Sequence, residues 1–420
     1  MARRVAPALS VGLLLAVATG APACSSSSSD APAPEAGQGG SSGEPSSGMD
    51  GGGPPRDAMA SDPDAAEPGV FGSDPLPPSF TKRLLDTNVY PDARCNDGTA
   101  SGYYAEAGKA GATTSWIIVL QGGAWCSTAQ DCAGRGAALT SSSTWAATIG
   151  PNGALSGNAT SNPHYAQANR VFVPYCTSDV FSGDRPAVPS VSNFQFRGRK
   201  VLAAVISDLR KRHGLGRKGQ SVVLGGLSAG AVGALASVDR VHAQIPDASL
   251  VGLVDAGFLP DVQPLAGPSI VQQFQSAMAV WNGLPNETCA ASTAAAPWKC
   301  YLGEYALAAA TTRVFVAHNL KDPNGALHTG GFTLGAGGTA TAQQTAWYNQ
   351  TYIPSMSALL GALPPVHGVF APCRSGVHTM ADSVDWTTFM LAGRLYDDDV
   401  AAFQAGNAAA PRSVEQPCTF

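Results

Sequence analysis

Short apolar runs alternate with helical patterns from about residue 80 onward, and this alternation constrains the fold more than any other feature. The apolar runs typical of buried strands are 115–123, 169–176, 221–226, 250–257, 312–318 and 365–373. Helical patterns follow at 198–214, 229–238 and 386–395, the last of these a closing helix. Strands that alternate with helices form mainly parallel sheets. We therefore expect an α/β fold with a mainly parallel central sheet and helices on both faces.

The first 78 residues differ from the rest of the chain. Residues 1–23 combine Arg3 and Arg4 with a short apolar stretch and small residues, which is typical of an export signal. Residues 24–78 are mostly Ser, Gly, Pro, Ala and Asp, and such a segment cannot bury enough apolar surface to fold. We expect a disordered tether there, with Cys24 free or carrying a lipid anchor. We expect one domain from 79 to 420, with a lid or insertion near 265–310.

Composition excludes one class of partner. The chain is 44% hydrophobic and 13% charged, enough apolar material for a large core. Its excess of acidic residues lies mainly in the tether, where Arg56 is the one basic residue. Because the remainder is close to neutral, nucleic-acid binding has no electrostatic support.

Cysteine usage agrees with export. Apart from Cys24 the chain has an even set of eight cysteines. An even number in an exported protein predicts disulfides, and the spacing of these cysteines does not match a metal site. The pattern by itself leaves the pairing open.

The segment VVLGGLSAGAVGA, residues 223–235, is a candidate nucleophile turn. A serine nucleophile sits on a sharp strand-to-helix turn, where Gly226 and Gly230 leave room for Ser228 and where the amide of Ala229 faces the developing oxyanion. A simple packing turn has the same small residues. The motif is informative because it lies between an expected strand and an expected helix.

A serine nucleophile requires a base and an acid, which follow it in the order Asp or Glu, then His. His378 is the preferred base because it lies in a loop after the last apolar run; His318, His328 and His367 are the alternatives. Asp322 is the preferred acid because it follows a strand, at the usual site edge of such sheets. The competing acids are Asp255, Asp261 and Asp382.

A second glycine loop, VLQGGAWC at 119–126, follows an early strand. In hydrolases of this type, such a loop supplies the other part of the oxyanion hole. Gly123 and Ala124 are the candidate amide donors, and Trp125 is a candidate pocket wall. Taken alone, the loop is equally consistent with a β-turn beside a core tryptophan.

Several segments together resemble the pectin acetylesterase and Notum family of carboxylesterases. They include LQGGAWCSTAQDCAGR, FRGRKVLAAVISDL, GGLSAG, VAHNLKDPN and CRSGVH, in the family's order. The resemblance implies an α/β-hydrolase-like fold with disulfide-stapled loops. It implies Ser228 as nucleophile, Asp322 as acid and His378 as base, with Gly123, Ala124 and Ala229 as oxyanion-hole donors.

The resemblance also implies pairings and pocket positions. The implied disulfides are Cys95 with Cys176, Cys126 with Cys132, Cys289 with Cys300, and Cys373 with Cys418. Ser182 and Asp184 are further pocket candidates near the site. The chain departs from the family pattern at Ala231, Pro323 and Asn324, which leaves the triad intact but affects the pockets for the acyl and leaving groups.

We therefore expect an exported serine carboxylesterase that hydrolyses O-acyl esters, foremost O-acetyl esters on a polysaccharide such as pectin. The alternatives are a deacylase of longer acyl esters, as in Notum, and a catalytically silent glycan-binding surface lipoprotein. No metal or cofactor is required. The protein is expected to be a monomer, secreted or lipid-anchored at a bacterial surface or in the periplasm, with membrane contact only through Cys24.

The acidic YDDDV segment, 396–400, is expected to be a solvated turn rather than a calcium site.

Overall fold

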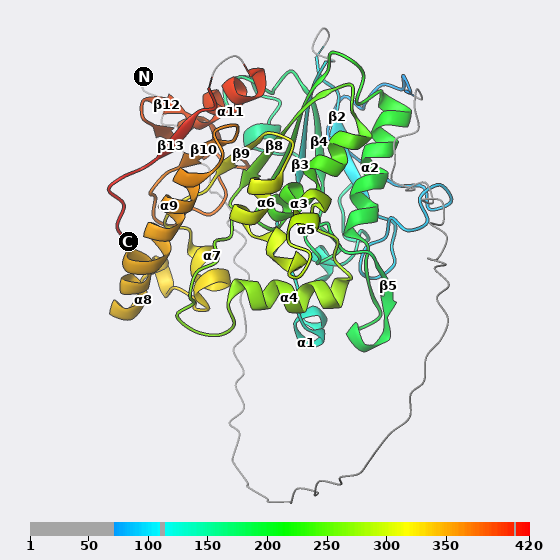
Figure 1. Cartoon of the computed structure of the whole chain (residues 1–420). Coiled ribbons are helices and arrows are strands. Elements are labelled where there is room, and N and C mark those ends of the chain that lie inside the picture. The colour runs from blue at the N-terminus through cyan, green and yellow to red at the C-terminus, as the bar shows by residue number, and fades with distance from the viewer. Residues whose placement is uncertain (1–70, 110–113, 407–408) are drawn as a thin grey trace, which may run out of the picture. The chain divides into compact units, whose positions relative to one another are not determined.

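The computed structural model describes residues 71–109, 114–406 and 409–420 (Figure 1). The expected export signal and nearly all of the expected tether lie outside the described residues. Among the described residues, none of the helices has the length and apolar character needed to span a bilayer.

A nine-stranded sheet forms the centre of the described part of the chain, in the order β1-β2-β4-β3-β7-β8-β9-β10-β13. Strands β1 and β2 are antiparallel to their neighbours, and the pairs from β4 to β13 are parallel. The strands are β1 (Thr81–Leu84), β2 (Gly102–Glu106), β3 (Ser115–Leu120), β4 (Asn169–Val173), β7 (Ser221–Leu227), β8 (Ser249–Asp255), β9 (Val314–Ala317), β10 (Gly368–Ala371) and β13 (Arg412–Val414). The predicted mainly parallel sheet is thus confirmed.

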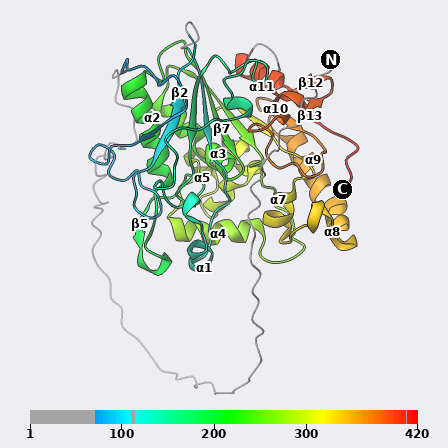
Figure 2. The ribbon, with the colours of Figure 1, turned by 180° about the vertical axis from the view of Figure 1, so that it is seen from behind.

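Helices cover both faces of this sheet (Figures 1 and 2). In β7, Val222 and Leu224 belong to the apolar cluster that also contains the buried residues of α2 (Gly198–His213) and α3 (Ala229–Gln244). Val223 points the other way, into a cluster shared with α11 (Tyr396–Ala405). Successive residues of a strand face opposite sides, so buried strands of this kind are apolar throughout rather than alternating.

Shorter elements lie in the loops between these. They are α1 (Ala129–Ala133), α4 (Ile270–Trp281), α5 (Glu287–Ser292), α6 (Gly303–Ala309), α7 (Pro323–Gly325), α8 (Ala342–Trp347), α9 (Ile353–Ala362), α10 (Asp385–Thr388) and the two-stranded ribbons β5 (Arg185–Val188) with β6 (Phe194–Phe196) and β11 (Met390–Leu391) with β12 (Arg394–Leu395). Helices α4, α5 and α6 make up most of the expected insertion.

The predicted position of the closing helix is wrong. Residues 386–395 contain only the short helix α10, followed by the β11–β12 ribbon, and the longer helix α11 starts at Tyr396. The cause is local: Ala392 and Gly393 both have positive φ, 52° and 79°, and this turn folds the chain back on itself. The acidic segment 396–400 is correspondingly the first turn of a helix, and Asp397 and Asp399 are buried rather than solvated.

Four disulfides connect loops of the described chain. They join Cys95 to Cys176, Cys126 to Cys132, Cys289 to Cys300, and Cys373 to Cys418. Two of them flank the functional loops described below, because Cys126 follows the glycine loop at 122–124 and Cys373 precedes His378. Cross-links of this kind limit how far such loops can move.

Candidate active site

Ser228 stands alone between the end of β7 and the start of α3, with φ 54° and ψ −120°. A non-glycine residue with this backbone is strained, and such strain persists only where the surroundings hold it. One holding contact is the hydrogen bond from the amide of Ser228 to the carbonyl oxygen of Asp255, at 2.8 Å. This is the sharp turn that exposes a serine hydroxyl at a helix N-terminus.

The two glycines around Ser228 are required by the close approach of the backbone. A Cβ atom on Gly226 would collide with the carbonyl group of Gly230, and one on Gly230 would collide with the carbonyl oxygen of Leu120. The glycines are therefore fixed by packing around the turn, independently of any chemistry at Ser228.

His378 and Asp322 lie together at the same edge of the sheet. His378 Nδ1 is 2.9 Å from both carboxylate oxygens of Asp322, which is 2% exposed. The amide of Asn324 donates to Asp322 Oδ1 at 2.8 Å, and the hydroxyl of Tyr348 donates to the Asp322 carbonyl oxygen at 2.7 Å. Several independent contacts therefore hold the carboxylate against the imidazole.

Ser228 and His378 line one cavity. His378 Nε2, the ring nitrogen that does not face Asp322, is buried and has no hydrogen-bond partner among the described residues, so no hydrogen bond to Ser228 Oγ is present. Hydrogen bonds between catalytic groups often tighten only when substrate is bound.

The pKa of His378 depends on burial and on the charged groups around it. Burial acts to lower the pKa of His378, but the hydrogen bond from its ring and the negative charge of Asp322 outweigh burial, assisted by Asp255 and Asp382. The pKa of the imidazole is therefore raised above the ordinary value of 6.5.

The competing acids occupy other positions. Asp255, at the end of β8, is fully buried and accepts hydrogen bonds at Oδ2 from the amides of Met380 and Ala381. Burial raises the pKa of Asp255 to about 7, although these two amides act to lower it. Asp255 thus ties the chain just after His378 to the Ser228 turn. Asp261 is exposed, and Asp382 lines the cavity.

The alternative histidines are buried or stacked. His318 Nε2 lies 3.0 Å from the hydroxyl of Tyr352, and burial lowers the pKa of His318 to about 4. His367 accepts the amide of Val314 at Nδ1 and donates to the carbonyl oxygen of Leu307 at Nε2. His328 lines the cavity, and burial lowers its pKa to about 4.

The glycine loop after β3 lies beside Ser228. Gly123 and Ala124 have φ of 141° and 52°, and Arg135 holds the loop by donating from Nη1 to the Gly123 carbonyl oxygen at 2.7 Å. The amides of Gly123, Ala124 and Ala229 have no acceptor among residues 71–109, 114–406 and 409–420. Unpaired amides at a strand-to-helix turn and a neighbouring loop are the usual components of an oxyanion hole.

The cavity has a volume of about 720 Å³. Its apolar lining residues include Leu139, Ile149, Leu155, Phe172, Leu227 and Leu327. Most of these come from loops far apart in the chain, and their sequence carries no pattern that identifies them as site residues. Asn324, one of the family departures, also lines the cavity.

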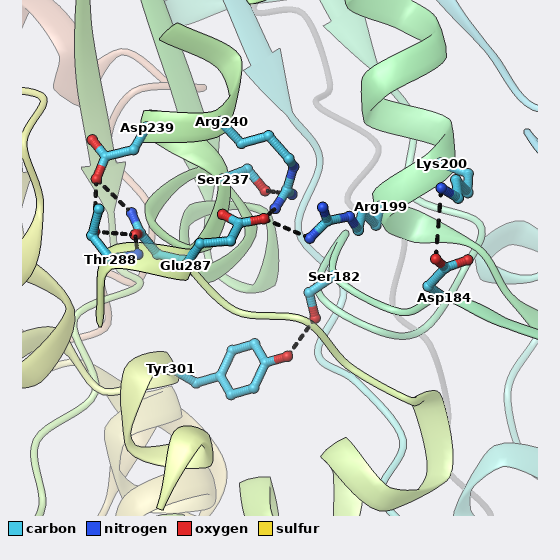
Figure 3. Close-up of polar contacts among 11 residues, drawn as sticks. Ser182, Asp184, Arg199, Lys200, Ser237, Asp239, Arg240, Glu287, Thr288 and Tyr301 are labelled. Carbon is cyan, nitrogen blue, oxygen red and sulfur yellow. Dashed lines mark hydrogen bonds and ion pairs between the residues drawn. The ribbon is translucent and has the colours of Figure 1, made fainter. Parts of the chain in front are cut away.

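The three pocket candidates differ in position. Trp125 lies close to the site, where it stacks on Phe274 of α4 and lies tilted against His328, with ring centroids 4.8 Å apart in both pairs. Ser182 and Asp184 do not line the cavity. Figure 3 shows Ser182 directed at Tyr301 and Asp184 at Lys200, in a polar cluster around α2 and α5.

That polar cluster is structural. Glu287 contacts both Arg199 and Arg240 (Figure 3). Asn286 donates to Asp239 at 2.9 Å. It fastens α5 of the insertion to α2 and α3. The sequence does not distinguish these roles for Ser182 and Asp184, because a short hydroxyl or carboxylate can satisfy the backbone and neighbouring side chains as readily as a substrate.

The other two departures from the family pattern are packed into the scaffold. Ala231 is buried in α3 against Gly257. Pro323 begins α7, directly after Asp322, where a proline suits the first position of a helix.

Comparison with known proteins places the chain in a family. The family model described as pectinacetylesterase matches residues 78–328. The chain is 33% identical to palmitoleoyl-protein carboxylesterase notum2 of Xenopus laevis over 54% of this chain and 49% of that protein. It is 30% identical to pectin acetylesterase 11 of Arabidopsis thaliana over 60% of this chain and 64% of that protein.

The fold agrees with these matches. The solved structure of the Wnt deacylase Notum from Drosophila superposes with a TM-score of 0.73 at 27% identity, covering 81% of this chain and 97% of that one. The matches to the Xenopus and Arabidopsis proteins span about half and two thirds of their length, respectively. The segment matched by the family model includes Ser228 and Asp322. The superposition with Notum covers 81% of this chain, which is more than the segment 78–328. The chain belongs to the pectinacetylesterase family.

Proposed function

We propose that this protein is an exported serine carboxylesterase in which Ser228, His378 and Asp322 form the catalytic triad. The observation that supports this most directly is the His378–Asp322 pair, at 2.9 Å, in which His378 lines the same cavity as Ser228 on its strained strand-to-helix turn. Family membership supports ester hydrolysis independently.

In the proposed reaction, His378 Nε2 takes the proton of Ser228 Oγ as the oxygen attacks the ester carbonyl carbon. The carbonyl electron pair moves onto oxygen, where the amides of Gly123, Ala124 and Ala229 stabilise the charge. Collapse of the tetrahedral intermediate breaks the ester bond, and the imidazolium protonates the leaving alcohol. Water, deprotonated by His378, then releases the acyl group and restores Ser228.

The acyl group is proposed from the cavity. Its volume of about 720 Å³ lies within the range of about 300–1,000 Å³ usual for small-molecule pockets. An acetyl group fills little of such a space, and the leucines and Phe172 along its walls offer apolar surface to a longer chain. We therefore favour an acyl chain longer than acetyl, whereas the similarity to pectin acetylesterase 11 favours acetyl groups on a polysaccharide.

A series of nitrophenyl esters from acetate to octanoate distinguishes these substrates. We expect kcat/KM to rise with chain length by at least about tenfold across the series, because each buried methylene contributes about 0.8 kcal/mol. Leu327 lines the cavity and is 45% exposed, so Leu327→Glu is expected to lower octanoate turnover while sparing acetate. Leu84→Glu, at a residue 43% exposed outside the cavity, is the matched control. A preference of the parent enzyme for acetate would favour polysaccharide deacetylation.

The pH profile tests the proposed base. His378 must be neutral to accept the proton, and its pKa is raised above 6.5. Activity is therefore expected to fall as the pH drops through a value above 6.5, when the imidazole becomes protonated. The measurement is kcat/KM against pH at constant ionic strength. An acid limb well below 6.5 would contradict His378 as the base.

Export and domain organisation complete the proposal. The four disulfides support an oxidising compartment, in agreement with the signal-like residues 1–23. We further propose that the insertion near 265–310 borders the site, because Phe274 of α4 stacks on Trp125 and Trp281 donates to the carbonyl oxygen of Cys126 at 2.7 Å.

A further inference from the structure

A second cluster of chemically active side chains lies between the loop that precedes β4 and the N-terminus of α11. His164 Nε2 is 2.8 Å from Asp398 Oδ1 and 3.9 Å from Asp397 Oδ2. One ligand atom from each of the three residues lies within 4.8 Å of the others. These residues take no part in the proposed ester hydrolysis.

Asp397 sets this cluster apart from an ordinary acidic surface. The residue is 1% exposed, and both of its carboxylate oxygens are buried without a hydrogen-bond partner in the part of the chain that the structure describes. Asp397 lies in the first turn of α11, where the helix dipole partly stabilises a negative charge. Burying a carboxylate with neither hydrogen bonds nor a close cation is costly, so its surroundings call for a counter-charge.

The charged groups near Asp397 neutralise its carboxylate only in part. Arg394 pairs through Nε with Asp399 Oδ1 at 2.9 Å, so its charge is shared with a different buried carboxylate. Asp398 adds a further negative charge next to Asp397. His164 also faces the carboxylate, with Nε2 3.9 Å from Asp397 Oδ2.

The loop that carries His164 is held firmly. Asn162 is fully buried and donates from Nδ2 to the carbonyl oxygens of Ala154 and Ser156, both at 2.9 Å. The hydroxyl of Tyr165 donates to Gln404 Oε1 of α11 at 2.9 Å. The loop is therefore held on both sides of His164, and Tyr165 ties it to α11, which is the rigidity that a preorganised ligand site requires.

We propose that His164, Asp397 and Asp398 bind a divalent transition-metal ion, with Zn²⁺ as the best fit. One imidazole and two carboxylates are a donor set that zinc accepts. Two ligands at about 2.1 Å from a tetrahedral ion stand about 3.4 Å apart, and the separations of 2.8 and 3.9 Å lie on either side of that value. The ion neutralises Asp397 and joins the loop before β4 to α11.

Zinc titration of the chelator-treated full chain tests this proposal. We expect saturable binding of one Zn²⁺ in calorimetry and a higher Tm in zinc than in chelator. His164→Ala and Asp398→Asn are each expected to weaken zinc binding by at least about tenfold. Asp247→Asn, which removes the same charge at an exposed position elsewhere, is the matched control and should bind like the parent.

Misfolding is separated from loss of a ligand by measuring Tm in chelator. The His164 and Asp398 side chains are 35% and 55% exposed, so both variants should unfold close to the parent when metal is absent. Cobalt replaces zinc as a spectroscopic probe, and its visible absorption should be lost in His164→Ala. Absence of saturable zinc binding, equal zinc affinity in parent and variants, or preference for Ca²⁺ over Zn²⁺ would each overturn the proposal.

Discussion

Ser228→Ala is expected to lower kcat for nitrophenyl ester hydrolysis by at least about four orders of magnitude, because the nucleophile is removed and only the oxyanion hole and binding remain. Alanine keeps the Cβ atom, so the strained turn with φ 54° is no more strained than before. Thermal unfolding should therefore be nearly unchanged. Ser249→Ala, at an exposed serine on β8, is the matched control and should retain full activity.

The same variant separates catalysis from binding alone. A phosphonate probe should label the parent protein at Ser228 and leave Ser228→Ala unlabelled, because covalent capture requires the activated hydroxyl. Equal esterase activity in the parent and in Ser228→Ala would contradict the proposed nucleophile. An inactive parent that still binds glycans would favour the silent surface-lipoprotein alternative.

Asp322→Asn has the second largest expected effect, a loss of about 10⁴ in kcat. An asparagine carbonyl can still accept the Asn324 amide, but loss of the charge removes the main support for the His378 imidazolium and its tautomer. The acid limb of the pH profile should shift to lower pH as the pKa of His378 falls. Parallel measurement of kcat, KM and pH dependence distinguishes this effect from loss of folding.

Asp255→Asn is the informative comparison for Asp322. Asp255 has a pKa of about 7, so it is partly neutral near that pH, and an amide oxygen can still accept the amides of Met380 and Ala381. Its substitution should therefore lower kcat by no more than about tenfold. A loss in Asp255→Asn as large as that in Asp322→Asn would transfer the role of the acid to Asp255.

Local patterns predicted most of the scaffold. The strands β3, β4, β7, β8, β9 and β10 lie where apolar runs indicated them, because buried parallel strands are apolar on both faces. The closing helix was misplaced because its apolar residues also suit a ribbon, and a turn at Ala392 and Gly393 decides between the two. Apolar content alone does not separate a short helix from a strand.

The Ser228 turn was predictable because its tight backbone packing restricts the residues on either side. Gly226 and Gly230 cannot carry a Cβ atom in this turn, so the motif around Ser228 is visible in the sequence. Nothing comparable marks Ile149, Leu155 or Leu327, which line the cavity only because their loops converge there. Apolar loop residues have no spacing that distinguishes a pocket wall from a packed surface.

The sequence by itself determined the α/β class, the strand-turn-helix around Ser228 and the short list of candidate bases and acids. These features depend on local periodicity and on steric limits within a few residues. Only the tertiary structure separated Asp322 from Asp255, by bringing the first to 2.9 Å from His378 and directing the second to the amides of Met380 and Ala381. Asp255 ends β8 and Asp322 follows β9, and these parallel strands end at the same sheet edge. Which one meets the imidazole depends on how loops distant in the chain pack across that edge, and local sequence does not encode that distance.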